Sequence, residues 1–142
     1  MQPMKKFTEN DLSKEAQQIL QILKKEKIDY RLEYTFSDLT GLKGVPFRFD
    51  FAIFSNKKLT ALIEYDSILH FDKNNKFVKN YRHYRENDLK KNRYALTHNI
   101  PLYRITCWDL PYIKEFQDLF KSEYKVKSIW HNYDIARKHG LL

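Results

Sequence analysis

The spacing of apolar side chains predicts an α/β domain. Over residues 10–27 they recur every three or four positions, which predicts an amphipathic helix that Thr8 or Ser13 could cap. Residues 30–36 and 47–54 alternate between apolar and polar side chains, and residues 59–65 form a third β-like run, so we expect three strands there. The loop before the second of these strands spans residues 37–46.

The rest of the chain predicts a helix, a strand and two short helices. These are residues 81–97, 102–106, 111–121 and 127–138, the last ending at Gly140. The four-residue connection 55–58 requires an antiparallel hairpin. The order αβββαβ followed by C-terminal helices therefore predicts a mixed sheet of about four strands flanked by helices. In the second strand we expect Phe47, Phe49, Phe51 and Ile53 to face the core, opposite Arg48 and Asp50.

The composition indicates one domain with a polyanionic partner. The chain has 142 residues, the size of a single domain, and we expect residues 1–9 to be a flexible lead. Its 26 Lys and Arg against 18 Asp and Glu give a net charge of +8, which attracts phosphates, although many small basic proteins bind no nucleic acid. A single cysteine, Cys107, fits a reducing compartment, and no apolar run is long enough for a membrane span. These features predict a cytoplasmic protein, in the host cytoplasm if it is phage-encoded.

Acidic side chains interrupt two of the predicted strands. Asp50 lies within an aromatic strand, and Glu64 and Asp66 share one side of the next strand. Asp66 is therefore a third candidate acid of the site, as a metal ligand or a base. The hairpin would bring Asp50 and Glu64 side by side, where two carboxylates remain ionised most readily around a divalent cation. The alternative is that each acid is a solvated residue on the open face of the sheet.

Further polar candidates follow the third strand. His70 could act as a general base toward water or donate to a phosphate, although a single loop histidine is usually only exposed to solvent. Arg85, Asp88 and Lys91 share one face of the helix predicted over residues 81–97. That face is either a solvated charge ladder or a wall of the site, with Arg85 or Lys91 contacting the phosphate.

In these segments the chain resembles the PD-(D/E)xK nuclease superfamily. The closest likeness is to its small phage-type branch, related to very-short-patch repair endonucleases and EDxHD homing endonucleases. The order and spacing of the pieces are more specific than any one of them. They are Ser13-Lys14-Glu15, Arg48-Phe49-Asp50-Phe51, Ile63-Glu64-Tyr65-Asp66, His70-Phe71, Asp88-Leu89-Lys90-Lys91 and Leu102-Tyr103-Arg104-Ile105.

The resemblance implies a restriction-endonuclease-like fold and a Mg²⁺-dependent DNA endonuclease, in which Mn²⁺ can substitute. It implies Asp50 as the central metal ligand with Glu64 beside it, and Glu15 as a helix acid that approaches the metal. It also implies His70 as the base or phosphate contact and Asp88 as a supporting acid. Arg48, Arg85 and Lys91 are the candidate nucleic-acid contacts.

The chain departs from the superfamily pattern at one important position. Asp66 stands where the superfamily has a lysine, so transition-state charge must be met by His70, Lys91 or a metal. The turn before the histidine also differs, with Asp66-Ser67 and Leu69-His70 in place of the usual Asp-Gly and Gln-His.

Two other functions remain open on the sequence. One is a catalytically inactive nucleic-acid-binding module, and the other is a protein-interaction domain that uses the aromatic stretch 129–133. The sequence does not distinguish DNA from RNA or a nick from a double-strand cut. It contains no evident specificity domain, which leaves a homodimer or a larger complex as the source of target choice.

Overall fold

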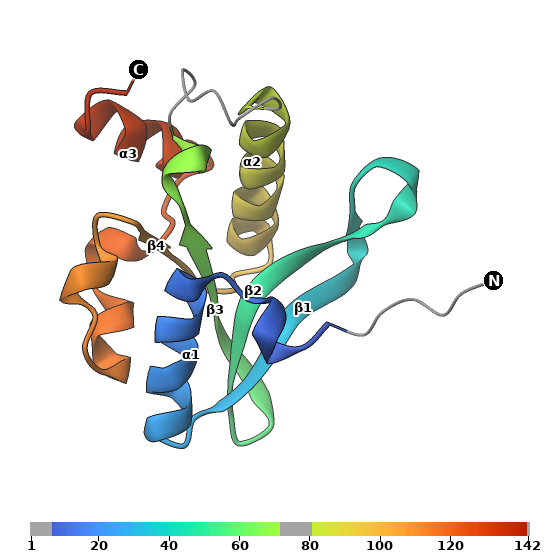
Figure 1. The fold of residues 1–142 in the computed structure, drawn as a ribbon. Helices are drawn as coiled ribbons and strands as arrows, with labels where there is room; N and C mark the ends of the chain where they lie inside the picture. The colour runs from blue at the N-terminus through green and yellow to red at the C-terminus, as the bar shows by residue number, and fades with distance from the viewer. Residues whose placement is uncertain (1–6, 72–80, 142) are drawn as a thin grey trace.

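A four-stranded mixed sheet forms the centre of the protein (Figure 1). The structure is a computed structural model, and it describes residues 7–71 and 81–141. The strands lie in the order β1-β2-β3-β4. Their bounds are β1 Asp29–Thr40, β2 Pro46–Ser55, β3 Lys58–Asp66 and β4 Leu102–Thr106.

The pairing of the strands follows from their connections. β1 pairs with β2, and β2 with β3, in antiparallel fashion, while β3 and β4 are parallel. The β2–β3 turn is tight because Asn56 and Lys57 both have left-handed backbone, with φ of 51° and 66°. A parallel partner requires a crossover, and α2, Tyr81–Thr97, lies between β3 and β4 in the chain. The predicted mixed sheet is confirmed.

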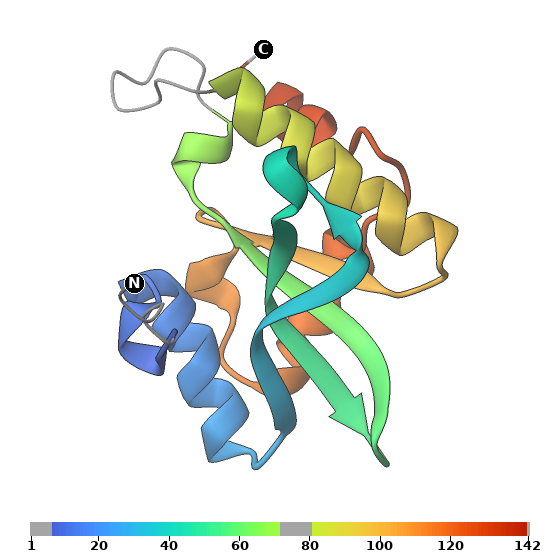
Figure 2. The ribbon, with the colours of Figure 1, turned by 90° about the vertical axis from the view of Figure 1, so that its right-hand side faces the viewer.

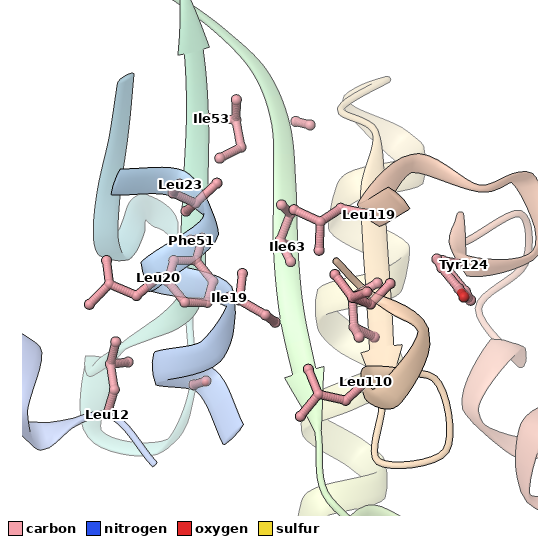
Figure 3. Close-up of a cluster of buried hydrophobic side chains, with 14 residues drawn as sticks. Leu12, Ile19, Leu20, Leu23, Phe51, Ile53, Ile63, Leu110, Leu119 and Tyr124 are labelled. Atoms are coloured by element: carbon pink, nitrogen blue, oxygen red, sulfur yellow. The ribbon is translucent and has the colours of Figure 1, made fainter. Parts of the chain in front are cut away.

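Helices α1 and α2 cover opposite faces of the sheet (Figure 2). α1, Lys14–Lys25, buries Ile19, Leu20 and Leu23 against Phe51 and Ile63 (Figure 3). Side chains from residues 110–124 complete this cluster. On the other face, α2 contributes to a smaller cluster, whose buried members are Leu39, Phe49, Ala52, Leu62, Ala95, Leu102 and Val126.

Of the two residues predicted as alternative caps of the first helix, Ser13 caps it, and the helix begins at Lys14 instead of near residue 10. The Ser13 hydroxyl accepts a hydrogen bond from Ala16 N at 3.1 Å and begins α1. Thr8 begins a preceding 3₁₀ turn, Glu9–Asp11, and its backbone N–H donates to the Asp11 carboxylate at 2.8 Å. Phe7 packs against the larger cluster. Residues 7–9 therefore do not belong to the flexible lead that was expected over residues 1–9. Residues 1–6 lie outside the described chain.

Three expectations about elements are wrong in part. β1 continues to Thr40, so the expected loop 37–46 shortens to a tip. Residues 111–121 form the 3₁₀ turns Leu110–Tyr112 and Phe116–Phe120, and only His131–Lys138 of the last predicted helix is α-helical, as α3. Two features favour short turns over a regular helix here. A proline lies at the first or second position of the first turn, and the apolar side chains Leu110, Ile113 and Leu119 are buried in the cluster on the sheet.

The expected single core face of β2 is also wrong. Phe51 belongs to the cluster under α1, whereas Phe49, two residues earlier, belongs to the cluster under α2. Glu33 of β1 lies between Leu32 and Tyr34, whose partners Phe51 and Phe49 flank Asp50. Glu33 has left-handed backbone, φ 51°, and such a residue within a strand interrupts the regular alternation of faces.

A helix that crosses a bilayer needs a long and continuously apolar segment. None of the described helices is long and apolar enough to cross a membrane.

Candidate active site

Asp50 of β2 and Glu64 of β3 lie side by side and are joined through the backbone. Glu64 Oε1 accepts a hydrogen bond from Asp50 N at 2.8 Å, and Asp50 Oδ2 accepts one from Tyr65 N at 2.7 Å. Each strand therefore holds the carboxylate of the other at the point where the Phe51–Ile63 ladder ends. The hairpin juxtaposes these two acids as the sequence predicted.

Two hollows meet at Asp50 and Tyr65. The larger, about 390 Å³, is lined by residues that include Glu64, His70 and Lys91. The smaller, about 260 Å³, is lined by Glu33 and by residues at the start of α1, Glu15 among them. A ligand could contact Asp50 from either side.

Asp50 lacks an equal countercharge. Burial and the Glu64 carboxylate raise the pKa of Asp50 well above its usual range, and the Tyr65 N–H and Lys91 lower it only in part. In the described part of the chain Asp50 forms no ion pair within 4.0 Å. A cation that bound here would restore the ionised form.

Lys91 of α2 faces the same hollow. Its Nζ lies 3.0 Å from Glu64 Oε2 and 5.4 Å from the centre of the Phe49 ring. Burial alone would lower the pKa of Lys91, but the Glu64 and Asp50 carboxylates together outweigh burial and raise it. A charged lysine therefore lies beside the carboxylate pair, although it comes from a helix and not from β3.

His70 lies between two further acids at the end of β3. Its Nδ1 is 3.0 Å from Asp88 Oδ2 and 3.6 Å from Asp66 Oδ1. Burial lowers the pKa of His70, but Asp66 and Asp88 more than reverse this and raise it to about 9. His70 is therefore an imidazolium at neutral pH and would act first as a donor.

Arg104 of β4 neutralises these acids from below. Its side chain is fully buried, and Nη1 donates to both carboxylate oxygens of Asp66, at 2.8 and 3.0 Å. Nε donates to Asn92 Oδ1 at 2.8 Å, and Nη2 lies 3.6 Å from Asp88 Oδ1. Asn132 of α3 donates to Asp66 at 3.2 Å, so β3, β4, α2 and α3 share one buried polar network.

In the described chain, two groups of side chains offer ligand atoms for a metal ion. Asp66, His70 and Asp88 offer three ligand atoms within 4.8 Å of one another. Arg104 already supplies a permanent positive charge to that group, and a metal would have to compete with it. The pair Asp50 and Glu64 offers fewer ligands, but it includes the carboxylate that lacks a full countercharge.

The remaining predicted residues lie at different distances from the carboxylate pair. Arg48 is exposed and lines the larger hollow, and Glu15 is exposed at the smaller one. Arg85 is 3% exposed, and its guanidinium carbon stacks 3.1 Å from the centre of the Tyr133 ring. It does not line either hollow, so the structure does not bring Arg85 to the site as a phosphate contact; the Tyr133 ring holds it elsewhere.

Sequence reasoning missed Glu33 and assigned no role to Arg104. Burial and the nearby Glu64 raise the pKa of Glu33, which lines the smaller hollow together with Asp50. Glu33 lies within the strand expected over residues 30–36, and only its place in the strand register near Asp50 could have indicated this role. Arg104 was noticed within its strand, and an arginine between buried apolar residues is a signal for a buried partner.

Comparisons with known proteins add no relative. No family model, no curated protein and no solved structure matches the chain. The geometry of the site is therefore the basis for assigning a function.

Proposed function

We propose that this protein is a divalent-metal-dependent DNA endonuclease that hydrolyses phosphodiester bonds, of the PD-(D/E)xK type suggested by its motifs. The observation that carries the proposal is the pair Asp50 and Glu64, held together on adjacent strands with one carboxylate lacking a full countercharge. The pair opens on a hollow that also contains Lys91 and His70. The mixed four-stranded sheet with helices on both faces is compatible with a restriction-endonuclease-like fold.

Asp50 and Glu64 are the residues that would hold Mg²⁺. Hard carboxylate oxygens suit this ion, and Mn²⁺ accepts the same ligands. When bound, the metal would lower the pKa of a water molecule and stabilise charge on the phosphoryl oxygens. Glu64 would have to exchange its ion pair with Lys91 for the metal, which frees the lysine at the site.

Lys91 takes the electrostatic role that Asp66 cannot. Asp66 stands at the lysine position of the superfamily, but it is fully buried and points into the Arg104 network. Lys91 lies at the site and carries the charge that a phosphorane-like transition state requires. A cation delivered from α2 therefore compensates for the missing cation on β3.

His70 would contact the phosphate or the leaving oxygen. Its Nδ1 is held by Asp88, and we assign the contact with substrate to the imidazolium ring. As an imidazolium it can donate a hydrogen bond or a proton, and Asp88 fixes the ring orientation. We assign it the acid role in preference to the base role.

The basic composition fits a DNA partner, and we place the protein in the cytoplasm.

The test uses purified protein and supercoiled plasmid. We expect nicking or cutting with Mg²⁺ or Mn²⁺ and none with EDTA. Asp50→Asn should lower the rate by at least 100-fold, because it removes the principal ligand. Without metal, the same variant should be about 1 kcal/mol more stable to unfolding, because the amide is buried beside Glu64 without either the charge or the proton uptake that the Asp50 carboxyl requires there. Glu86→Gln, at an exposed acid that lines neither hollow, is the control for stability.

A metal-independent result would change the conclusion. If folded protein cleaves neither DNA nor RNA with any divalent metal but binds DNA in a salt-dependent way, the inactive binding module becomes the function. One structural observation supports that alternative. Two of the acids already form ion pairs with cationic side chains, Glu64 with Lys91 and Asp66 with Arg104, so they are neutralised without a metal.

Neighbouring lysines of α2 test the role of the helix. Lys91→Ala should reduce kcat by about 100-fold, since one preorganised charge contact is removed. Lys90→Ala removes the same charge from an exposed position, with Nζ 5.9 Å from the centre of the Phe47 ring. It should leave kcat unchanged and alter only the salt dependence of binding. Equal loss of kcat in both variants would contradict the assignment.

A further inference from the structure

The β1–β2 hairpin extends beyond the rest of the sheet and ends in an apolar tip (Figure 1). The ladder between β2 and β3 begins at Phe51, and before it Pro46, Arg48 and Phe49 pair with β1. At the tip, Leu42 is 82% exposed and Val45 is 59% exposed. We define the apolar tip as residues 41–45. It faces the viewer in Figure 2.

The tip has a fixed conformation. Gly41 N donates to Val45 O at 2.8 Å, and Lys43 and Gly44 have left-handed backbone, with φ of 62° and 73°. The Phe47 ring packs so closely on Gly41 that an added Cβ there would lie 2.7 Å from a ring carbon. An exposed leucine is thus held in a defined place and not on a loose loop.

The hairpin is also fastened to α2. The Tyr94 hydroxyl donates to Asp38 Oδ1 at 2.6 Å, and the rings of Tyr94 and Phe36 lie 4.9 Å apart. From this base the strand runs along the larger hollow, whose lining includes Val45 and Arg48 together with Asp50 and His70. The apolar tip therefore stands at the rim of the candidate active site.

The charges around the tip favour a polyanion over other occupants. Residues 40–49 include Lys43 and Arg48 and no acid, and Lys90 and Lys91 approach the same strand from α2. Two exposed apolar side chains are far too little for a stable dimer, which buries about 800 Å² on each partner. A leucine cannot neutralise phosphate. Once the neighbouring cations have bound the DNA backbone, however, the leucine can pack against the bases.

We propose that Leu42 is a wedge that enters duplex DNA at a base step when the backbone lies in the hollow, with Lys43 and Arg48 on the flanking phosphates. The inference rests on the proposed function for its ligand. Insertion would unstack one step and bend the duplex, and bending would bring the scissile phosphate toward Asp50. Target choice would then depend on how easily a step unstacks, which pyrimidine–purine steps do best.

The test measures unstacking without cleavage. Wild-type protein in EDTA is titrated into a 30-base-pair duplex that carries 2-aminopurine at a central position, and fluorescence and anisotropy are recorded. Wild type should raise the fluorescence. Leu42→Ser should abolish the rise and weaken binding about tenfold, with an unchanged salt slope. Leu42→Met should restore both. Tyr112→Ser, at a residue that is 70% exposed and outside the lining of either hollow, is the control.

The outcomes separate this inference from the nuclease proposal. If Leu42→Ser matches wild type in fluorescence and affinity, the wedge is overturned, whether or not plasmid is cleaved with Mg²⁺. If wild type sediments as a dimer that Leu42→Ser dissociates, the tip is a contact between copies and the wedge is again overturned. Leu42-dependent unstacking by a protein that never cleaves supports the wedge and removes the nuclease.

Discussion

At the scale of single residues, the site contains acidic side chains that are costly to bury in the ionised form without a bound cation. Asp50 is raised in pKa by burial and by Glu64, and Glu33 is raised by burial and by the same neighbour. The backbone of Glu33 is left-handed within a strand, a conformation that costs about 1 kcal/mol or more in a residue with a Cβ. Such residues persist where function requires them, so we place Glu33 beside Asp50 in the site.

His70 gives a pH prediction with a definite sign. Its pKa is raised from 6.5 to about 9 in the folded protein, so the stabilisation is complete below pH 6.5 and is lost as the pH rises to about 9. The contribution is about 3 kcal/mol at most. Urea unfolding at pH 6, 7.5 and 9 should therefore show a steeper loss of stability in wild type than in His70→Gln.

The matched control for this prediction is His98→Gln. His98 is exposed at the end of α2, 3.7 Å from the exposed Asp38 carboxylate. Its variant should keep the wild-type dependence on pH. Parallel slopes for wild type and His70→Gln would mean that Asp66 and Asp88 do not hold the imidazolium.

At the scale of elements, the buried network around Arg104 joins four of them. Arg104 of β4 contacts Asp66 of β3, Asn92 of α2 lies beside it, and Asn132 of α3 closes the network. Asn132 also accepts a hydrogen bond from Asn92 Nδ2 at 3.1 Å. Because the polar groups of each element are satisfied by another, the network fixes how the two helices meet the sheet.

Removing the shared cation should be costly. Arg104→Met leaves Asp66 buried without its partner and should lower the free energy of unfolding by about 3–5 kcal/mol, measured by urea denaturation. The double variant Arg104→Met with Asp66→Leu replaces the whole pair and should recover part of the loss. Equal instability of the single and double variants would show that Asp66 is not the group left uncompensated.

The elements also differ in how far their sequences predict them. The pattern predicts the existence and order of α1, α2 and the four strands, although β1 extends to Thr40 and the alternation of faces in β2 is interrupted. Residues 111–121 have helix-like spacing but form 3₁₀ turns, because their apolar side chains pack on the sheet surface. The division of Phe49 and Phe51 between two clusters coincides with the left-handed backbone of Glu33, a residue of another strand.

At the scale of the whole molecule, charge and metal act together on stability. The net charge of +8 opposes folding by self-repulsion, so any salt stabilises the protein to some degree. Specific binding of Mg²⁺ at Asp50 and Glu64 should add to this. At ten times its Kd the metal contributes about 1.4 kcal/mol, or about 3–6 °C in Tm.

A thermal scan separates the two effects. MgCl₂ should raise Tm more than NaCl at equal ionic strength, and Asp50→Asn should respond to both salts alike. The excess should grow with pH, because the metal displaces a proton from Asp50, whose pKa is raised. An excess that survives in Asp50→Asn would point to Asp66, His70 and Asp88 as the metal ligands.

The sequence by itself determined the order of elements, the hairpin and the juxtaposition of Asp50 and Glu64, because local periodicity and a short turn suffice for these. Only the tertiary structure decided which cation serves which acid. Lys91 is 27 residues from Glu64, and Arg104 is 38 residues from Asp66. The tertiary structure also stacks Arg85 on Tyr133, outside the lining of both hollows, and leaves Leu42 exposed at the tip of the β1–β2 hairpin. Side-chain pairing between distant segments depends on packing, which a linear pattern does not contain.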